Sequence, residues 1–262
     1  MFSKTFDILK RNPIIIIFYL IYSAAAFGLM LPIISGGYNT NDLNEVVTFL
    51  LKMAVIYLFM AVFALIFFSG FGQMLAESAV TGTTSASSFI PGLKKYFVRV
   101  LLSALLLFAF YIGFCIVLGI MMIPITILIG VMGTNMSDPV ALTSLVTSIT
   151  LGITGLILIF SAPFILLWYP AIFIDNIGVL EGLGRGARAS VKNYWKLVLL
   201  LIIMFIPTAI YFAVSFPANM KGYTMTPGYV VMYVMCIILS IFLLTATHVI
   251  YNDCKEIGLF DV

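Results

Sequence analysis

The chain has 262 residues, of which 63% are hydrophobic and only 9% are charged, and its mean hydropathy is +1.20. A soluble domain carries roughly a quarter charged residues, so no water-soluble fold could bury this much apolar surface, and the bilayer must be the solvent for most of the chain. The formal net charge of +3 indicates no nucleic-acid partner, and the three cysteines do not form the even-numbered pattern of a disulfide framework.

The first apolar segment, "DILKRNPIIIIFYLIYSAAAFG" at residues 7–28, fits either a cleavable secretory signal or a permanent membrane span. Its apolar run continues past Ala26 through "FGLMLPII", which is too long for a short signal core. Its "LK" lead-in also recurs inside the chain as Leu93 and Lys94. We therefore expect no cleaved signal peptide, and we interpret the segment as the first lead-in and first span.

A helix needs about 20 mainly apolar residues to cross a hydrocarbon core of about 30 Å. The runs that meet this length are 13–34, 46–70, 98–131, 143–172, 196–217 and 228–251. The third and fourth are longer than one crossing needs, so we expect kinks at Pro124 and Pro163. The sequence thus predicts an all-α polytopic membrane protein, with six transmembrane helices in one integral membrane domain over residues 1–262.

The basic residues are sorted between the connections of these runs. An even number of spans places both termini on one side of the membrane, and only Lys52 and Lys221 of the thirteen basic residues fall toward the other side. Because positive loops stay in the cytoplasm, we expect both termini to be cytoplasmic and the protein to lie in the cell (inner or plasma) membrane.

Three segments share one plan, in which an amphipathic stretch and a basic pair precede a span. They begin at Phe6, Phe89 and Arg185, and the following even-numbered spans end near the acidic residues Glu77, Asp175 and Asp253. This pattern predicts three parallel pseudo-repeats, at about 1–80, 81–178 and 179–262. Each would be a helix hairpin preceded by an interfacial amphipathic helix on the cytoplasmic side.

The lead-in before the fifth span is the clearest of the three. Its apolar residues Leu180, Leu183, Ala187, Val191 and Tyr194 share one helical face. Its charged residues share another, and Glu181 and Arg185 have the spacing of an i,i+4 ion pair. We expect the bilayer and its anionic headgroups to be the partners of these lead-ins. The predicted headgroup contacts are Lys10, Arg11, Lys94, Lys95, Arg185, Arg188 and Lys192.

The glycine-rich stretch "GLGRGA" at residues 182–187 superficially suggests a nucleotide loop. It follows no strand, and no lysine followed by serine or threonine comes after it. The glycines are better explained by close helix packing or bending, and we expect neither a cofactor nor a catalytic group here.

Polar residues gather where the even-numbered spans meet the cytoplasmic boundary. They are Gln73, Glu77, Asp175, Asn176, His248 and Asn252. Polar groups at this depth are costly unless they are paired or hydrated. If the repeat is genuine they form a ring, which is either a structural hydrogen-bond belt or the mouth of a substrate path. A metal at His248, the only histidine, would need ligands from several spans, and we predict none.

Residues 168–203, "WYPAIFIDNIGVLEGLGRGARASVKNYWKLVLLLII", place a proline near a span end, then an acidic turn, a small-residue amphipathic helix and a "K-x-x-W" motif. This order resembles the uncharacterised YciC-like multi-pass proteins and the membrane domain attached to some glycerophosphoryl diester phosphodiesterases. The resemblance implies a multi-pass helical fold and no established chemistry, since the catalytic barrel of the fused relatives has no counterpart in this chain.

These observations favour a non-enzymatic membrane protein, either a scaffold or an accessory subunit of a transport or envelope system, with a membrane protein as its partner. The alternative is a transporter or flippase of lipid-like or apolar solutes, which the parallel repeats and proline breaks would suit. An intramembrane enzyme is the least favoured class, because no catalytic motif is recognisable.

Overall fold

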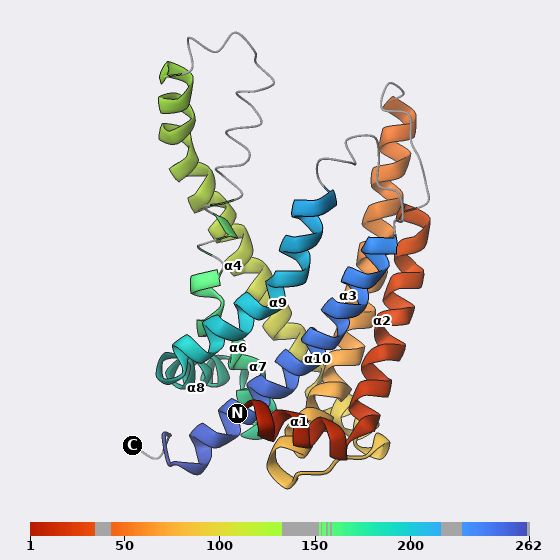
Figure 1. Ribbon diagram of the computed structural model, residues 1–262, viewed down its shortest axis with the longest axis vertical. Helices are drawn as coiled ribbons and strands as arrows, with labels where there is room; N and C mark the ends of the chain where they lie inside the picture. The colour runs from red at the N-terminus through yellow and green to blue at the C-terminus, as the bar shows by residue number, and fades with distance from the viewer. Residues whose placement is uncertain are drawn as a thin grey trace.

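The computed structural model describes residues 1–34, 43–132, 159–215 and 227–260, together with positions 152, 154, 155 and 157 (Figure 1). Within these residues all regular structure is helical, so the all-α prediction is confirmed. The elements are α1 (Phe2–Arg11), α2 (Pro13–Ile34), α3 (Leu43–Thr81), η1 (Ala86–Ser88), α4 (Phe89–Met132), α6 (Pro163–Leu166), α7 (Trp168–Ile174), α8 (Val179–Lys192), α9 (Tyr194–Ser215) and α10 (Pro227–Glu256).

Four of the described helices are long and apolar enough to cross a membrane, at Pro13–Leu31, Leu43–Thr81, Ala86–Ile120 and Val230–Glu256. Helices α8 and α9 meet at 90° and pass the same criterion only as a pair, so the described residues contain up to five such spans if the bent pair is one span. Helix is the expected form for these runs, because lipid offers no hydrogen-bond partner and a helix satisfies its own backbone groups. The length and composition of these helices therefore indicate an integral membrane protein.

Both termini lie at one end of the molecule, which we call the basal end and define as residues 1–13, 75–99, 167–197 and 246–260 (Figure 1). Helices α2, α4 and α9 lead away from this end, and α3 and α10 return to it. Eleven of the thirteen lysines and arginines fall within these ranges. The basic residues that the sequence places in alternate connections therefore lie together at one end of the molecule.

The core is concentrated at the basal end. The C-terminal half of α10 is its centre, because it packs against α1, α3, α7 and α9 and is buried at nearly every position from Leu243 to Cys254. Further from the basal end the described helices expose mostly apolar side chains, and α4 and α3 are far apart at their other ends (Figure 1). The basal half therefore holds the helices together, and the rest presents a lipid-compatible surface.

Separate lead-in helices are present at two of the three predicted positions, as α1 before α2 and as α8 before α9. Helix α1 ends at Arg11 and is capped by Asn12, where the following proline disfavours a helical conformation, and α8 ends at Lys192 and is capped by Asn193. The second lead-in was expected to be a separate helix, but residues 89–97 are the first turns of α4 itself. No proline or helix-ending residue follows Lys94 and Lys95, so the backbone continues into the span.

The first half of the predicted run 143–172, up to residue 158, lies mostly outside the described residues, so the sixth predicted span is not tested. In its described end a turn at residue 162 separates helical residues 159–161 from α6, which begins at Pro163, and α7 follows. Pro124 lies within α4, which continues on both sides of it.

Candidate functional site

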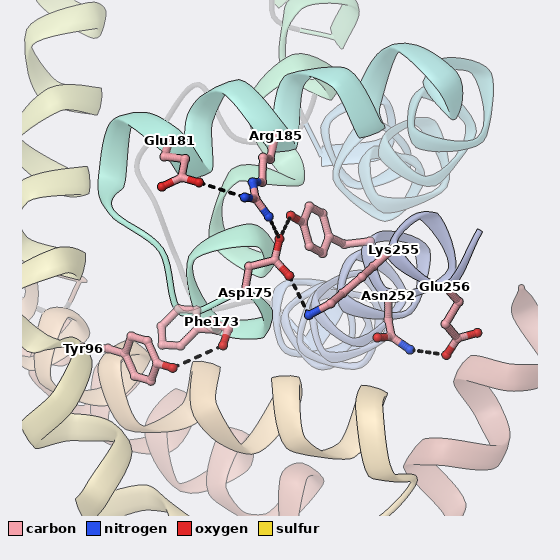
Figure 2. A network of polar contacts seen from close by, with 9 residues as sticks. Tyr96, Phe173, Asp175, Glu181, Arg185, Asn252, Lys255 and Glu256 are labelled. Atoms are coloured by element: carbon pink, nitrogen blue, oxygen red, sulfur yellow. Dashed lines mark hydrogen bonds and ion pairs between the residues drawn. The ribbon is translucent and has the colours of Figure 1, made fainter. Parts of the chain in front are cut away.

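Asp175, which directly follows α7, has three side-chain partners at the basal end. Its carboxylate is only 3% exposed. The Oδ2 atom lies 3.0 Å from Nη1 of Arg185 and accepts a hydrogen bond of 2.6 Å from the hydroxyl of Tyr251, while Oδ1 lies 2.8 Å from Nζ of Lys255 (Figure 2). One buried carboxylate therefore links α7 to both α8 and α10.

The charge of Asp175 is maintained by these partners. Burial by itself would raise the pKa of Asp175, but the hydrogen bonds from Lys255 and Tyr251, together with the charge of Lys255 and the bond from Arg185, lower it below its ordinary value. Asp175 is consequently ionised at neutral pH. Both carboxylate oxygens already have cationic or hydroxyl partners. Asp175 therefore acts as a structural anion that holds α7, α8 and α10 together.

Arg185 contacts a second carboxylate, on α8, in addition to that of Asp175. Its Nη2 lies 2.9 Å from Oε1 of Glu181, which confirms the i,i+4 pair that the sequence predicts. The guanidinium carbon also lies 5.9 Å from the centre of the Phe260 ring. The structure thus directs Arg185 toward protein groups, whereas the sequence analysis assigned it to lipid headgroups.

The glycine-rich stretch of α8 packs closely, as predicted. A Cβ atom on Gly186 would lie 2.7 Å from the backbone Cα and N of Trp168, and one on Gly182 would lie 2.7 Å from Cγ1 of Ile172. The indole Nε1 of Trp168 donates a hydrogen bond of 2.7 Å to the carbonyl of Val179. Two glycines, one turn apart, therefore let α8 approach α6 and α7 at backbone contact, as small residues do between membrane helices.

Two buried asparagines stand at the bends between lead-in helix and span. Asn12 Nδ2 donates to the carbonyls of Ile8 and Gly82, at 2.8 and 3.0 Å, and its Oδ1 accepts from the backbone N–H of Thr84 at 2.7 Å. Asn193 Nδ2 donates to the carbonyl of Ala189 at 3.2 Å and contacts Sγ of Cys254 at 3.0 Å.

The two bends are therefore alike. Each asparagine bonds the carbonyl four residues before it and reaches a helix that returns to the basal end: Asn12 bonds Gly82, just after α3, and Asn193 bonds Cys254, in the last turn of α10. A buried amide that satisfies backbone groups on two segments fixes the angle between them.

The predicted polar ring is distributed over separate contacts. The ends of α3, α7 and α10 do pack together. Glu77, however, accepts hydrogen bonds from Thr84 and Ser88 in the connection to α4, and exposed Asn176 accepts one of 2.8 Å from Nη1 of Arg99. These two residues bond the α3–α4 connection and α4 rather than each other.

The remaining ring residues are also engaged locally. Asn252 Nδ2 donates to the carbonyl of Ala79 at 3.2 Å and to Oε1 of Glu256 at 2.7 Å, which joins α10 to α3. Gln73 lies against Gly92 at the crossing of α3 and α4. Five of the ring residues therefore lie on different helix contacts.

His248 is almost completely buried, with its ring 6.5 Å from that of Phe173. Its Nδ1 lies 2.8 Å from the carbonyl of Leu244, and Nε2 has no hydrogen-bond partner among the described residues. Among those residues no three His, Cys, Asp or Glu side chains converge as metal ligands would. The constellation required for a metal at His248 is not present in the described part of the chain.

Six of the seven predicted headgroup contacts are exposed at the basal end and make no ion pair with a described residue. They are Lys10, Arg11, Lys94, Lys95, Arg188 and Lys192. Exposure and free charge are the conditions that contact with anionic lipid requires.

The sequence analysis missed Tyr251, Lys255, Tyr96 and the two asparagines. Tyr251 and Lys255 are four residues apart on α10 and so share a face, which was a readable signal for a common partner. The hydroxyl of buried Tyr96, which donates to the carbonyl of Phe173 at 3.2 Å (Figure 2), had no such signal because its partner is 77 residues away.

The fold and the site together define a polytopic, all-helical integral membrane protein whose spans are held by a polar network at one end. A family described as a domain of unknown function (DUF7847) matches residues 1–254, and the chain belongs to that family. No curated protein and no solved structure matches the chain. None of these comparisons supports a link to the YciC-like proteins or to the phosphodiesterase membrane domain.

Proposed function

We propose that this protein is a non-enzymatic membrane scaffold or accessory subunit of a transport or envelope system. The observation that carries the proposal is the part of α3 furthest from the basal end. None of the residues in its most apolar 18-residue window is buried against described protein. Leu51, Leu58 and Phe59 are among the most exposed. A span with so much free apolar surface offers close packing to a transmembrane helix of another protein.

The polar groups of the basal end support the same proposal. A transporter would need Glu77, Asp175 and His248 to line a path for its substrate. Glu77 instead bonds the connection after α3, Asp175 is held by three side chains, and His248 is buried beside Phe173. Their contacts favour a structural belt, and therefore favour the scaffold over the transporter or flippase.

The contact surface on α3 is tested by photocrosslinking in intact membranes. We expect a photoreactive residue at Leu51 or Leu58 to crosslink one membrane protein in stoichiometric yield. The same residue at Ile116 or Ile120 of α4, which are similarly exposed, is the matched control and should give only lipid adducts. Equal, protein-free labelling at all four positions would contradict the proposal, as would repeated purification in mild detergent without a stoichiometric partner.

We further propose six spans in three parallel pseudo-repeats, with both termini in the cytoplasm. Support comes from the common position of the termini and most basic residues at the basal end, and from the matching bends at Asn12 and Asn193.

This topology predicts the accessibility of single introduced cysteines. A membrane-impermeant maleimide should label Leu43→Cys, at the start of α3, in intact cells, because that residue lies at the non-basal end and is highly exposed. Ser87→Cys, in the exposed basal connection, should react only after permeabilisation. Labelling of the unchanged protein supplies the background from its own cysteines, and the reverse order of labelling would invert the topology.

A further inference from the structure

A surface cavity of about 500 Å³ lies at the bend between α8 and α9. Its lining residues are Phe164, Val191, Lys192, Asn193, Tyr194, Trp195 and Lys196. The volume is within the range of pockets that hold small molecules, about 300–1,000 Å³. Asp175 and its partners Arg185, Tyr251 and Lys255 are not among the residues that line this cavity.

The cavity is positively charged. Lys192 is exposed and makes no ion pair with a described residue, and Nζ of Lys196 bonds the neutral side-chain oxygen of Asn193 at 3.1 Å. No carboxylate is among the lining residues. Two lysines without a lining counter-charge favour an anionic occupant.

The remaining walls are apolar. Trp195 is 74% exposed. The rings of Phe164 and Tyr194 are 5.4 Å apart, and the Tyr194 hydroxyl donates a hydrogen bond of 3.0 Å to the carbonyl of Phe160, which holds this wall in place. An occupant that fits both the lysines and these walls must combine an anionic group with an apolar body.

The position of the cavity identifies the occupant. Helix α9 enters the apolar region at 90° to α8, whose charged face belongs to the basal surface. The bend between an interfacial helix and a span lies at the depth of lipid headgroups, where tryptophan and tyrosine are also enriched. We infer that the bend binds an anionic glycerophospholipid of the surrounding bilayer. Its phosphate lies between Lys192 and Lys196, and its glycerol and acyl portion lies along Trp195 and Val191.

The tryptophans allow a direct test in proteoliposomes made from the purified chain and lipid. The chain has only two tryptophans, and Trp168 is 1% exposed, so quenching by brominated acyl chains reports on Trp195. We expect brominated phosphatidylglycerol to quench at a mole fraction on the order of tenfold lower than brominated phosphatidylcholine, since each nearby lysine adds about 1 kcal/mol toward anionic lipid. Trp195→Phe should remove the selective component. Equal quenching by the two lipids in the unchanged protein would overturn the inference.

A charge-matched pair of variants separates this site from general surface attraction. Lys192→Gln with Lys196→Gln should abolish the preference for phosphatidylglycerol. Lys94→Gln with Lys95→Gln, which removes two exposed basal lysines of α4, should leave it nearly intact. Equal loss in the two double variants would show that diffuse charge, and not the cavity, selects the lipid. In phosphatidylcholine proteoliposomes inorganic phosphate should leave the Trp195 emission unchanged at millimolar concentration, and saturable binding of phosphate alone would overturn a lipid occupant.

These measurements are independent of the partner proposed for α3. The cavity is built only from residues around α6, α8 and α9, and proteoliposomes made from the purified chain and lipid hold no other protein. A failed crosslink from α3 therefore leaves the lipid test intact, and the lipid result bears on this bend alone.

Discussion

Asp175→Asn is expected to destabilise the protein by roughly 2–3 kcal/mol and to loosen α8 from α10. Asparagine keeps the shape of the side chain but removes the charge shared by Arg185 and Lys255. Removing one partner of a fully buried pair costs about 3–5 kcal/mol. The value here is lower because the two cations are 35% and 48% exposed and can recover part of their hydration. Thermal unfolding in detergent, followed by retention of the monodisperse peak, measures the change.

The matched control is Asp253→Asn. Asp253 pairs with Lys4 across α1 and α10, but these side chains are 45% and 43% exposed. Exposed pairs contribute about 0–1 kcal/mol, so this variant should unfold close to the temperature of the unchanged protein. Equal destabilisation by the two substitutions would contradict the central position that we give to Asp175.

The same residue predicts a pH dependence. The pKa of Asp175 is lower in the folded state than its ordinary value of 3.8. The unfolded chain therefore binds the proton more tightly, and the stabilisation is complete above the ordinary pKa and is lost as the pH falls through the folded value. The difference in stability between the unchanged protein and Asp175→Asn should consequently shrink below about pH 4. A difference that persists unchanged in strong acid would show that charge is not its source.

Gly186→Ala is expected to have the second largest effect, a loss of about 1–3 kcal/mol. The added methyl group would lie 2.7 Å from the backbone of Trp168. Because backbone atoms cannot rotate away as a flexible side chain can, α8 would have to move outward and pull Arg185 from Asp175. The emission of buried Trp168 should shift to longer wavelength, which provides a spectroscopic measure of that movement beside the unfolding temperature.

Gly184→Ala is the control on the same helix. A Cβ atom at residue 184 would have no neighbour within 4 Å. Alanine should therefore leave stability unchanged or raise it by up to about 1 kcal/mol through its helix propensity. If the two alanine variants behave alike, helix propensity and not packing would govern this stretch.

The sequence predicted the helical class, the positions of the long apolar runs and the Glu181–Arg185 pair because these depend on composition and on residues close in the chain. The assignment of Arg185 to headgroups was incomplete because its second partner, Asp175, lies across the turn between α7 and α8. The bonds of Asn12 with Gly82 and Thr84, and of Tyr251 with Asp175, join residues more than 65 positions apart. No periodicity in one segment can indicate such pairings.

The orientation of α8 shows a second reason why the structure differs from the prediction made from the sequence. Its apolar stripe was read from periodicity, but Leu180 and Val191 are exposed, and the buried face consists of Gly182, Gly186 and Ala189 with Ser190. In water the apolar face of a helix turns inward. Beside a bilayer lipid can cover that face, and the small residues turn inward because they permit the closest approach to Trp168.

The contacts of α1 impose an order on biosynthesis. Lys4 pairs with Asp253, and Phe2 and Phe6 lie against Phe242, more than 230 residues later. At about 5–20 residues per second, roughly 10–50 s must pass between the synthesis of α1 and that of its partner. During that interval α1 lacks its contacts with α10, so the first helix made can dock against α10 only after the last helix has been synthesised.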